Sequence, residues 1–248
     1  MATVERAPKI DSGRVINRGF RSLGDNVLPF LMVALLFVGL PSAAIQYLLL
    51  GMRELDPGFF WAAMLAGWML AALLQGMLVR ATVLDLADQD MEIEKCAMTA
   101  LALILPIFAI SLIVALVTVV GLLFAIVPGT LFYIAMSVAI PALIEERAGV
   151  FGSLRRSWRL TRGTWLQIFV LMVLYLIFWG VVSTIFGVAF GVRNFGMGAN
   201  EPLMAALSNG LSATITAAVG AVMLASLYVE LRSVKEGATT DDLASIFA

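Results

Sequence analysis

Residues 27–50 have the sequence VLPFLMVALLFVGLPSAAIQYLLL, in which no side chain carries a charge. A helix needs about 20 apolar residues to cross the roughly 30 Å of hydrocarbon in a bilayer, so this stretch predicts a transmembrane helix. The rest of the chain has the same character, since 61% of its 248 residues are hydrophobic and 13% are charged. A soluble domain carries about 25% charged residues. The sequence therefore predicts an integral membrane protein.

Five further stretches are apolar enough to form transmembrane helices. They are Phe59–Val79, Ala97–Val120, Thr130–Leu143, Trp165–Val188 and Met204–Leu231. Only Pro128 and Gly129 separate the third span from the fourth, so one long re-entrant element is an alternative there. The predicted fold class is all-α, a polytopic membrane bundle of about six transmembrane helices in a single domain over residues 1–248.

The positive charges lie on alternate connections between these spans. All but two of the 16 lysines and arginines precede the first span or follow the second, the fourth or the sixth. With six spans these connections share one side of the membrane, which the positive-inside rule assigns to the cytoplasm. We therefore expect residues 1–26 and the tail 232–248 to be cytoplasmic. Arg80 and Glu230 lie at span ends, where we expect their long side chains to reach water.

Three polar segments, each preceding a pair of spans, give the chain a weak internal pattern. They are Ser12–Asn26, Asp90–Thr99 and Gly149–Thr164. We expect amphipathic helices at the cytoplasmic membrane surface, and three helical-hairpin repeats are one interpretation. The alternative is that any membrane protein with three hairpins has this pattern.

The first of these segments is basic on one face. Arg14, Arg18 and Arg21 are four and three residues apart, which places them on one side of a helix. The apolar residues at the same spacing on the opposite side are Ile16, Phe20 and Leu23. Such a helix suits a lipid headgroup layer. It serves either as an anchor for the first span or as a recognition element for phosphate groups of lipids or partners.

The last of these segments combines aromatic and basic residues. Phe151, Leu154 and Trp158 form one stripe, and Arg155, Arg159 and Arg162 flank it, whereas Arg156 points elsewhere. Glu145 and Glu146 precede the segment and could pair with Arg155 or Arg156, as structural ion pairs, as part of a headgroup pocket, or as catalytic carboxylates. The candidate lipid- or partner-binding residues are Arg14, Arg18, Arg21, Glu145, Arg155, Arg156, Trp158 and Arg159.

The last span carries a stripe of small residues. Its members are Gly210, Ala213, Ala217, Ala221 and Ala225. Small residues allow helix backbones to approach closely within a membrane. This span is therefore expected to pack centrally in the bundle, or else to form a seam between copies of the chain.

Several kinds of chemistry lack their usual residues. The chain has no histidine and one cysteine, Cys96, so neither an intrachain disulfide nor a zinc site of the Cys/His type is expected. Neither a phosphate-binding Gly-x4-Gly-Lys loop nor a Gly-x-Ser-x-Gly motif is present. The net charge of −1 gives no indication of a nucleic-acid partner. We expect no metal, no cofactor and no enzymatic activity.

Two stretches of the chain resemble a known family. Residues 139–163, AIPALIEERAGVFGSLRRSWRLTRG, and the tail residues 227–232, LYVELR, resemble the bacterial membrane domain of glycerophosphoryl diester phosphodiesterase and the YciC-like inner-membrane proteins. The resemblance implies a six-span bacterial inner-membrane protein with a role in lipid or envelope homeostasis. The metal-and-histidine chemistry of the phosphodiesterase domain has no residues here, so the resemblance implies no such activity.

The leading functional hypothesis is a non-enzymatic protein that binds or organises lipids or partner proteins at the cytoplasmic leaflet. A small transporter is an alternative, which a continuous polar cavity through the bundle would favour. A lipid-modifying enzyme that uses Glu145 or Glu146 is another, and it requires a pocket joining these carboxylates to the basic helix.

Overall fold

The computed structural model describes residues 10–52, 56–191 and 202–237, and within these ranges the secondary structure is entirely helical. The elements are α1 (Ser12–Asp25), α2 (Val27–Ala34), the π-helical turn η1 (Leu35–Gly39), α3 (Leu40–Gly51), α4 (Pro57–Leu86), α5 (Ile93–Ala102), α6 (Ile104–Phe124), α7 (Ile126–Met136), α8 (Ala139–Glu146), α9 (Gly149–Thr161), α10 (Trp165–Ala189) and α11 (Pro202–Glu236).

Six helical segments of the described chain are long and apolar enough to cross a membrane. They are Val27–Gly51, Pro57–Leu86, Ile104–Phe124, Ile126–Glu146, Trp165–Ala189 and Pro202–Glu236. The all-α class and the number of apolar helices are therefore confirmed, and the chain has the helices of a membrane protein.

Two predicted boundaries around the third span are wrong. The span begins at Ile104 rather than at Ala97, because residues 97–102 belong to the separate helix α5. Pro106 then lies in the first turn of α6, where a backbone N–H has no helical partner and proline is tolerated. The break before α7 falls at Ala125, which has extended backbone angles, and Pro128 is again accommodated in a first turn.

Helix α11 is the central helix of the bundle. It packs against α1, α3, α4 and α10, and its Gly210 lies against Gly39 of η1. A Cβ atom on Gly210 would lie 2.7 Å from the carbonyl oxygen of Gly39, so no larger residue fits there without displacement. The small-residue stripe faces inward in part: Gly210, Ala221 and Ala225 are buried, whereas Ala213 and Ala217 are partly exposed.

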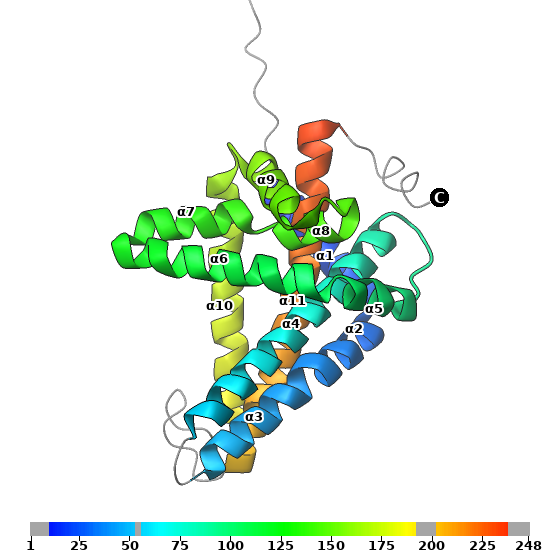
Figure 1. The fold of residues 1–248 in the computed structure, drawn as a ribbon. Coiled ribbons are helices and arrows are strands. Elements are labelled where there is room, and N and C mark those ends of the chain that lie inside the picture. The colour runs from blue at the N-terminus through cyan, green and yellow to red at the C-terminus, as the bar shows by residue number, and fades with distance from the viewer. Residues whose placement is uncertain (1–9, 53–55, 192–201, 238–248) are drawn as a thin grey trace, which may run out of the picture.

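The long helices do not all run in one direction. Helices α2–α3, α4, α10 and α11 run lengthwise, whereas the α6–α7 hairpin lies crosswise to them near one end of the molecule (Figure 1). The order of one short helix followed by a hairpin therefore occurs three times along the chain, but the second hairpin is oriented differently from the others.

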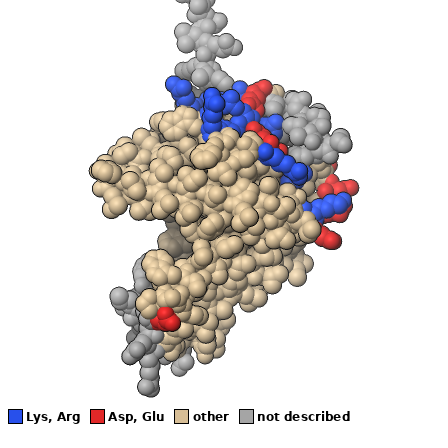
Figure 2. All heavy atoms as spheres, in the orientation of Figure 1, with Lys and Arg blue, Asp and Glu red and all other residues tan. Residues whose placement is uncertain are grey.

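Lysines and arginines gather at the end of the molecule that carries α1, α5, α8 and α9 (Figure 2). We call this end the basic cap, and its residues are Arg14, Arg18, Arg21, Arg80, Lys95, Arg147, Arg155, Arg156, Arg159, Arg162, Arg232 and Lys235. Arg53 and Arg193, the two exceptions in the sequence pattern, lie outside the described residues, as do residues 1–9 and 238–248.

Candidate functional site

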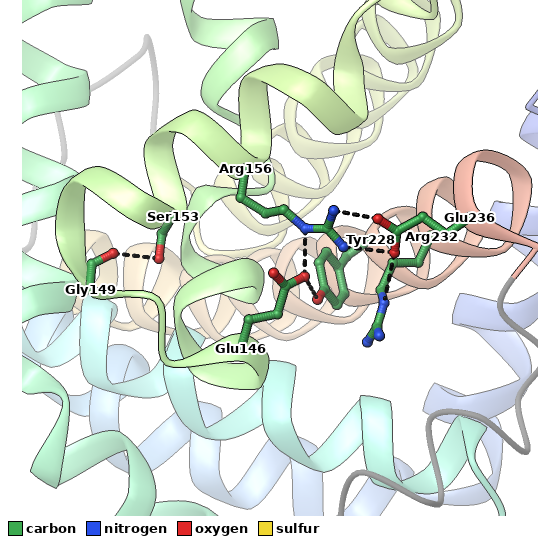
Figure 3. A network of polar contacts seen from close by, with 7 residues as sticks. All are labelled: Glu146, Gly149, Ser153, Arg156, Tyr228, Arg232 and Glu236. Carbon is green, nitrogen blue, oxygen red and sulfur yellow. Dashed lines mark hydrogen bonds and ion pairs between the residues drawn. The ribbon is translucent and has the colours of Figure 1, made fainter.

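A network of charged residues joins α8, α9 and α11 inside the basic cap (Figure 3). Arg156 Nε donates to Glu146 Oε1 at 2.7 Å, and its Nη2 donates to Glu236 Oε2 at 2.7 Å. A further hydrogen bond joins Nη1 to the other oxygen of Glu236, so the guanidinium binds this carboxylate with two parallel bonds. These bonds, the ones to Glu236 first, raise the pKa of Arg156 above its ordinary value. The side chain therefore stays charged.

Two further residues of α11 complete this network. The hydroxyl of Tyr228 donates to Glu146 Oε1 at 2.8 Å, and Tyr228 is fully buried. Arg232 Nε lies 3.4 Å from Glu236 Oε2, one helical turn away. The network thus fastens α9 to the end of the central helix through charged hydrogen bonds, which are stronger than neutral ones.

The turn between α8 and α9 brings Glu146 opposite Arg156. Helix α8 ends at Glu146, the next residue, Arg147, has left-handed backbone angles, and Gly149 follows with a φ of +70°. A glycine adopts this conformation at little cost. The chain therefore reverses within three residues, and the end of α8 faces the inner side of α9.

The break between α7 and α8 provides a hydrogen-bond acceptor for the C-terminal half of α9. The interruption between α7 and α8 leaves the carbonyl of Ala135 available, and this oxygen accepts hydrogen bonds from Ser157 Oγ at 2.7 Å and Thr161 Oγ1 at 3.2 Å. Both hydroxyl-bearing residues are fully buried. The inner face of α9 is thus polar at its centre but hydrogen-bonded, as buried polar groups require.

Glu145, the neighbour of Glu146, belongs to a different ion pair. Its Oε2 accepts a hydrogen bond from Arg80 Nη1 of α4 at 2.8 Å, and its side chain is 1% exposed. Its Oε1 is buried and accepts no hydrogen bond. The two adjacent carboxylates therefore point to different arginines, as expected for neighbours that diverge by about 100° on a helix.

A third ion cluster holds the N-terminal helix. Glu230 of α11 accepts from Arg18 at 2.8 Å, and Arg14 lies 3.0 Å from its other oxygen. The expectation that Glu230 reaches water is wrong, because this side chain is fully buried. Helix α1 packs on α11 through Val15, Gly19 and Ser22, a stripe between its arginine face and its apolar face.

The outer face of α9 has a different composition. Phe151, Arg155, Trp158 and Arg162 occupy positions i, i+4, i+7 and i+11, and all four are exposed. The ring of Trp158 makes an edge contact with Trp165 at a centroid distance of 5.8 Å. Arg159 lies beside this stripe and is also exposed. Among the described residues no acidic side chain forms an ion pair with Arg155, Arg159 or Arg162. We use the name outer stripe for the five exposed residues Phe151, Arg155, Trp158, Arg159 and Arg162.

The structure thus divides the predicted site residues into three groups. Arg14 and Arg18 bind Glu230, Glu145 and Arg156 belong to separate inner ion pairs, and the outward-facing residues are Arg155, Trp158 and Arg159, with Arg21 exposed on α1. Of the pairings left open between Glu145 or Glu146 and Arg155 or Arg156, only that of Glu146 with Arg156 is present in the described residues, because Glu145 pairs with Arg80 instead. The partners contributed by α11, Tyr228 and Glu236, were missed because nothing in the local sequence links them to α9.

Described residues line an open groove and a very small cavity, both of which are apolar. One, of about 660 Å³, is an open groove along α10 between Ile177 and Ala189. The other, of about 10 Å³, lies beside Cys96 and is lined by apolar side chains of α2, α4 and α5. Neither is lined by Glu145 or Glu146. No group of three or more histidine, cysteine or acidic residues that could hold a metal ion occurs in the described ranges.

Comparisons with known proteins provide a family but no activity. No curated protein and no solved structure matches the chain. A family model described as a domain of unknown function (DUF7847) matches residues 93–231, which is more than half of the chain and runs from α5 into the part of α11 that bears Tyr228 and Glu230. The chain therefore belongs to the DUF7847 family, a domain of unknown function.

Proposed function

We propose that this protein is a non-enzymatic, multi-pass protein of a bacterial inner membrane that binds and organises anionic lipids at the cytoplasmic leaflet through the outer stripe of α9. The basic cap faces the cytoplasm in this proposal, as the positive-inside rule predicts for its charges, and both ends of the chain lie on that side. The observation that carries the proposal is the exposed alternation of aromatic and arginine residues along one face of α9.

The composition of this stripe suits the boundary between headgroups and acyl chains. Tryptophan and tyrosine side chains concentrate at this level of a membrane, and arginine guanidinium groups bind phosphate with two hydrogen bonds. Each basic residue near an anionic leaflet contributes about 1 kcal/mol of attraction. Because no described carboxylate pairs with Arg155 or Arg159, both remain free to bind lipid phosphate.

The inner network supports this function by holding α9 in place. Arg156 connects α9 to Glu146 and Glu236, so the helix that carries the outer stripe is already held in place before a ligand binds. Preorganisation of this kind reduces the entropy lost when a ligand binds.

The resemblance to the membrane domain of glycerophosphoryl diester phosphodiesterase agrees with a lipid-associated role. The family match does not itself connect the chain to a phosphodiesterase, so this relationship stays a prediction.

The test compares two double variants that remove the same charge. R155Q/R159Q removes two arginines of the outer stripe, and R21Q/R147Q removes two exposed arginines elsewhere on the basic cap. The proteins are extracted in native-lipid nanodiscs, and the anionic lipid retained per protein is measured by mass spectrometry. Removing two arginines from the outer stripe removes about 2 kcal/mol of attraction to anionic lipid, which predicts a roughly 30-fold weaker association of the first variant with that lipid.

Equal lipid retention by the two double variants would overturn the proposal, because the outer stripe would then be no more than a share of the overall positive charge. Retained lipid together with the loss of a co-purifying acidic protein from R155Q/R159Q would also contradict it, and would assign the stripe to a protein partner.

A further inference from the structure

The α6–α7 hairpin extends beyond the packed part of the molecule. Helix α6 has two buried residues, Ile107 and Ile110, both in its first two turns. Residues 111–133 form what we call the distal arm. The only buried residue in this arm is Gly129, which packs against Gly121 inside the hairpin itself. Val114, near the start of the arm, packs partly buried against the main hydrophobic core. The rest of the protein therefore covers the root of the hairpin and leaves most of the arm exposed.

The distal arm has few polar groups that could bind water. No residue from Ala97 to Ile144 is charged. At the tip, the exposed fractions of Leu123, Phe124 and Ile126 are 82%, 86% and 76%. The hydroxyls of Ser111 and Thr130 donate to carbonyls of their own helices, so they do not make the surface polar. Apolar side chains are exposed on both helices of the arm and across its tip, a distribution typical of contact with lipid.

The tip also differs from the other two connections at the ends of hairpins. Residues 51–56, GMRELD, carry three charges, and residues 190–201, FGVRNFGMGANE, carry two charges and two asparagines. The tip of the α6–α7 hairpin, residues 122–129, has the sequence LLFAIVPG. A connection that emerges on the far side of a membrane lies in water and headgroups, and this one lacks any side chain suited to them.

The packing places the hairpin beside the basic cap. Helix α6 contacts α4, α5, α8 and α9, and α7 contacts α9 and α10. Most of these partners are the short helices of the cap. The hairpin lies crosswise to α10 and α11, on the side of the molecule that carries the charges (Figures 1 and 2). A helix of 21 residues is about 31 Å long and could cross a bilayer, but a crosswise helix does not.

We propose that the α6–α7 hairpin does not cross the membrane and instead lies in the leaflet next to the basic cap, with its distal arm surrounded by the acyl chains of that leaflet. Four segments then cross: α2–α3, α4, α10 and α11. The hairpin begins and ends on the cap side in either arrangement, so the distribution of charges is the same for four spans as for six. This inference does not depend on headgroup binding by α9.

Cysteine labelling tests this arrangement. The native Cys96 is buried, and burial raises the pKa of its thiol to about 11, so it reacts slowly. Three variants each add one cysteine: Ala125→Cys at the tip, Gly24→Cys on the cap and Gly51→Cys at the opposite end of α3. Both glycines have open space where the new Cβ would lie. A membrane-impermeant maleimide is applied to right-side-out and inside-out vesicles.

We expect that the maleimide never labels the tip cysteine in the same vesicle orientation in which it labels Gly51→Cys. The tip cysteine is instead labelled in the same orientation as Gly24→Cys, or in neither orientation. A fluorophore on Ala125→Cys then measures depth, with brominated lipids placed in one leaflet at a time. Quenching several times stronger from the cap-side leaflet supports the proposal. Labelling together with Gly51→Cys, or stronger quenching from the opposite leaflet, would overturn it.

Discussion

Arginines on the two faces of α9 have opposite environments. On the inner face, Arg156 is 13% exposed and donates hydrogen bonds to two carboxylates. On the outer face, Arg155 and Arg159 are exposed and pair with no described acid. Arg155 and Arg156 are neighbours in the chain, yet the rotation of about 100° per residue sends one into the protein and the other out of it. A count of arginines therefore says little about lipid binding until each one is placed.

The largest expected effect follows from removing the inner arginine. Arg156→Ala leaves Glu146 and Glu236 without their shared partner, and we expect a loss of roughly 2–4 kcal/mol of stability, since breaking a largely buried ion pair is costly. Thermal unfolding in detergent measures it, with a thiol-reactive dye reporting the exposure of Cys96. Unchanged unfolding of Arg156→Ala would mean that the network does not hold α9.

A smaller effect is expected from the tyrosine that binds the same carboxylate. Tyr228→Phe removes a buried donor to the charged Glu146, which we expect to cost about 1.5–3 kcal/mol, toward the lower value because Arg156 still binds that oxygen. Tyr175→Phe is the matched control, since its hydroxyl donates to the neutral carbonyl of Thr216 at 3.0 Å. If the two variants unfold at the same temperature, the charge on Glu146 adds nothing to the bond.

The smallest effect on stability is expected from the outer face. R155Q/R159Q changes exposed residues without described partners, so its stability should stay within about 0.5 kcal/mol of the parent protein. The same dye-based unfolding measurement applies. A stability loss as large as that of Arg156→Ala would show that the two faces of α9 are not distinct, and the lipid measurement on this variant would then need another explanation.

Much of the cap could be predicted from local sequence. The helix over residues 149–161 and the exposure of Trp158 follow from short-range spacing, which also places Glu145 and Glu146 near Arg155 and Arg156 but does not say which of them pair. The remainder depends on contacts between distant segments. Glu230 meets Arg14 and Arg18 across more than 200 residues of chain, and Arg80 meets Glu145 across 65. A pattern within one helix says where a charge points on that helix, but not which other helix lies opposite.

The sequence by itself determined that the chain forms six long apolar helices and that all but two of its 16 lysines and arginines belong to one side, because the preference of a side chain for water or hydrocarbon is set by its own chemistry. Only the tertiary structure decided which arginines are neutralised inside, and that the α6–α7 hairpin lies crosswise to the other helices. Those properties depend on how helices far apart in the chain pack together, and apolar helices of equal hydropathy pack in many ways.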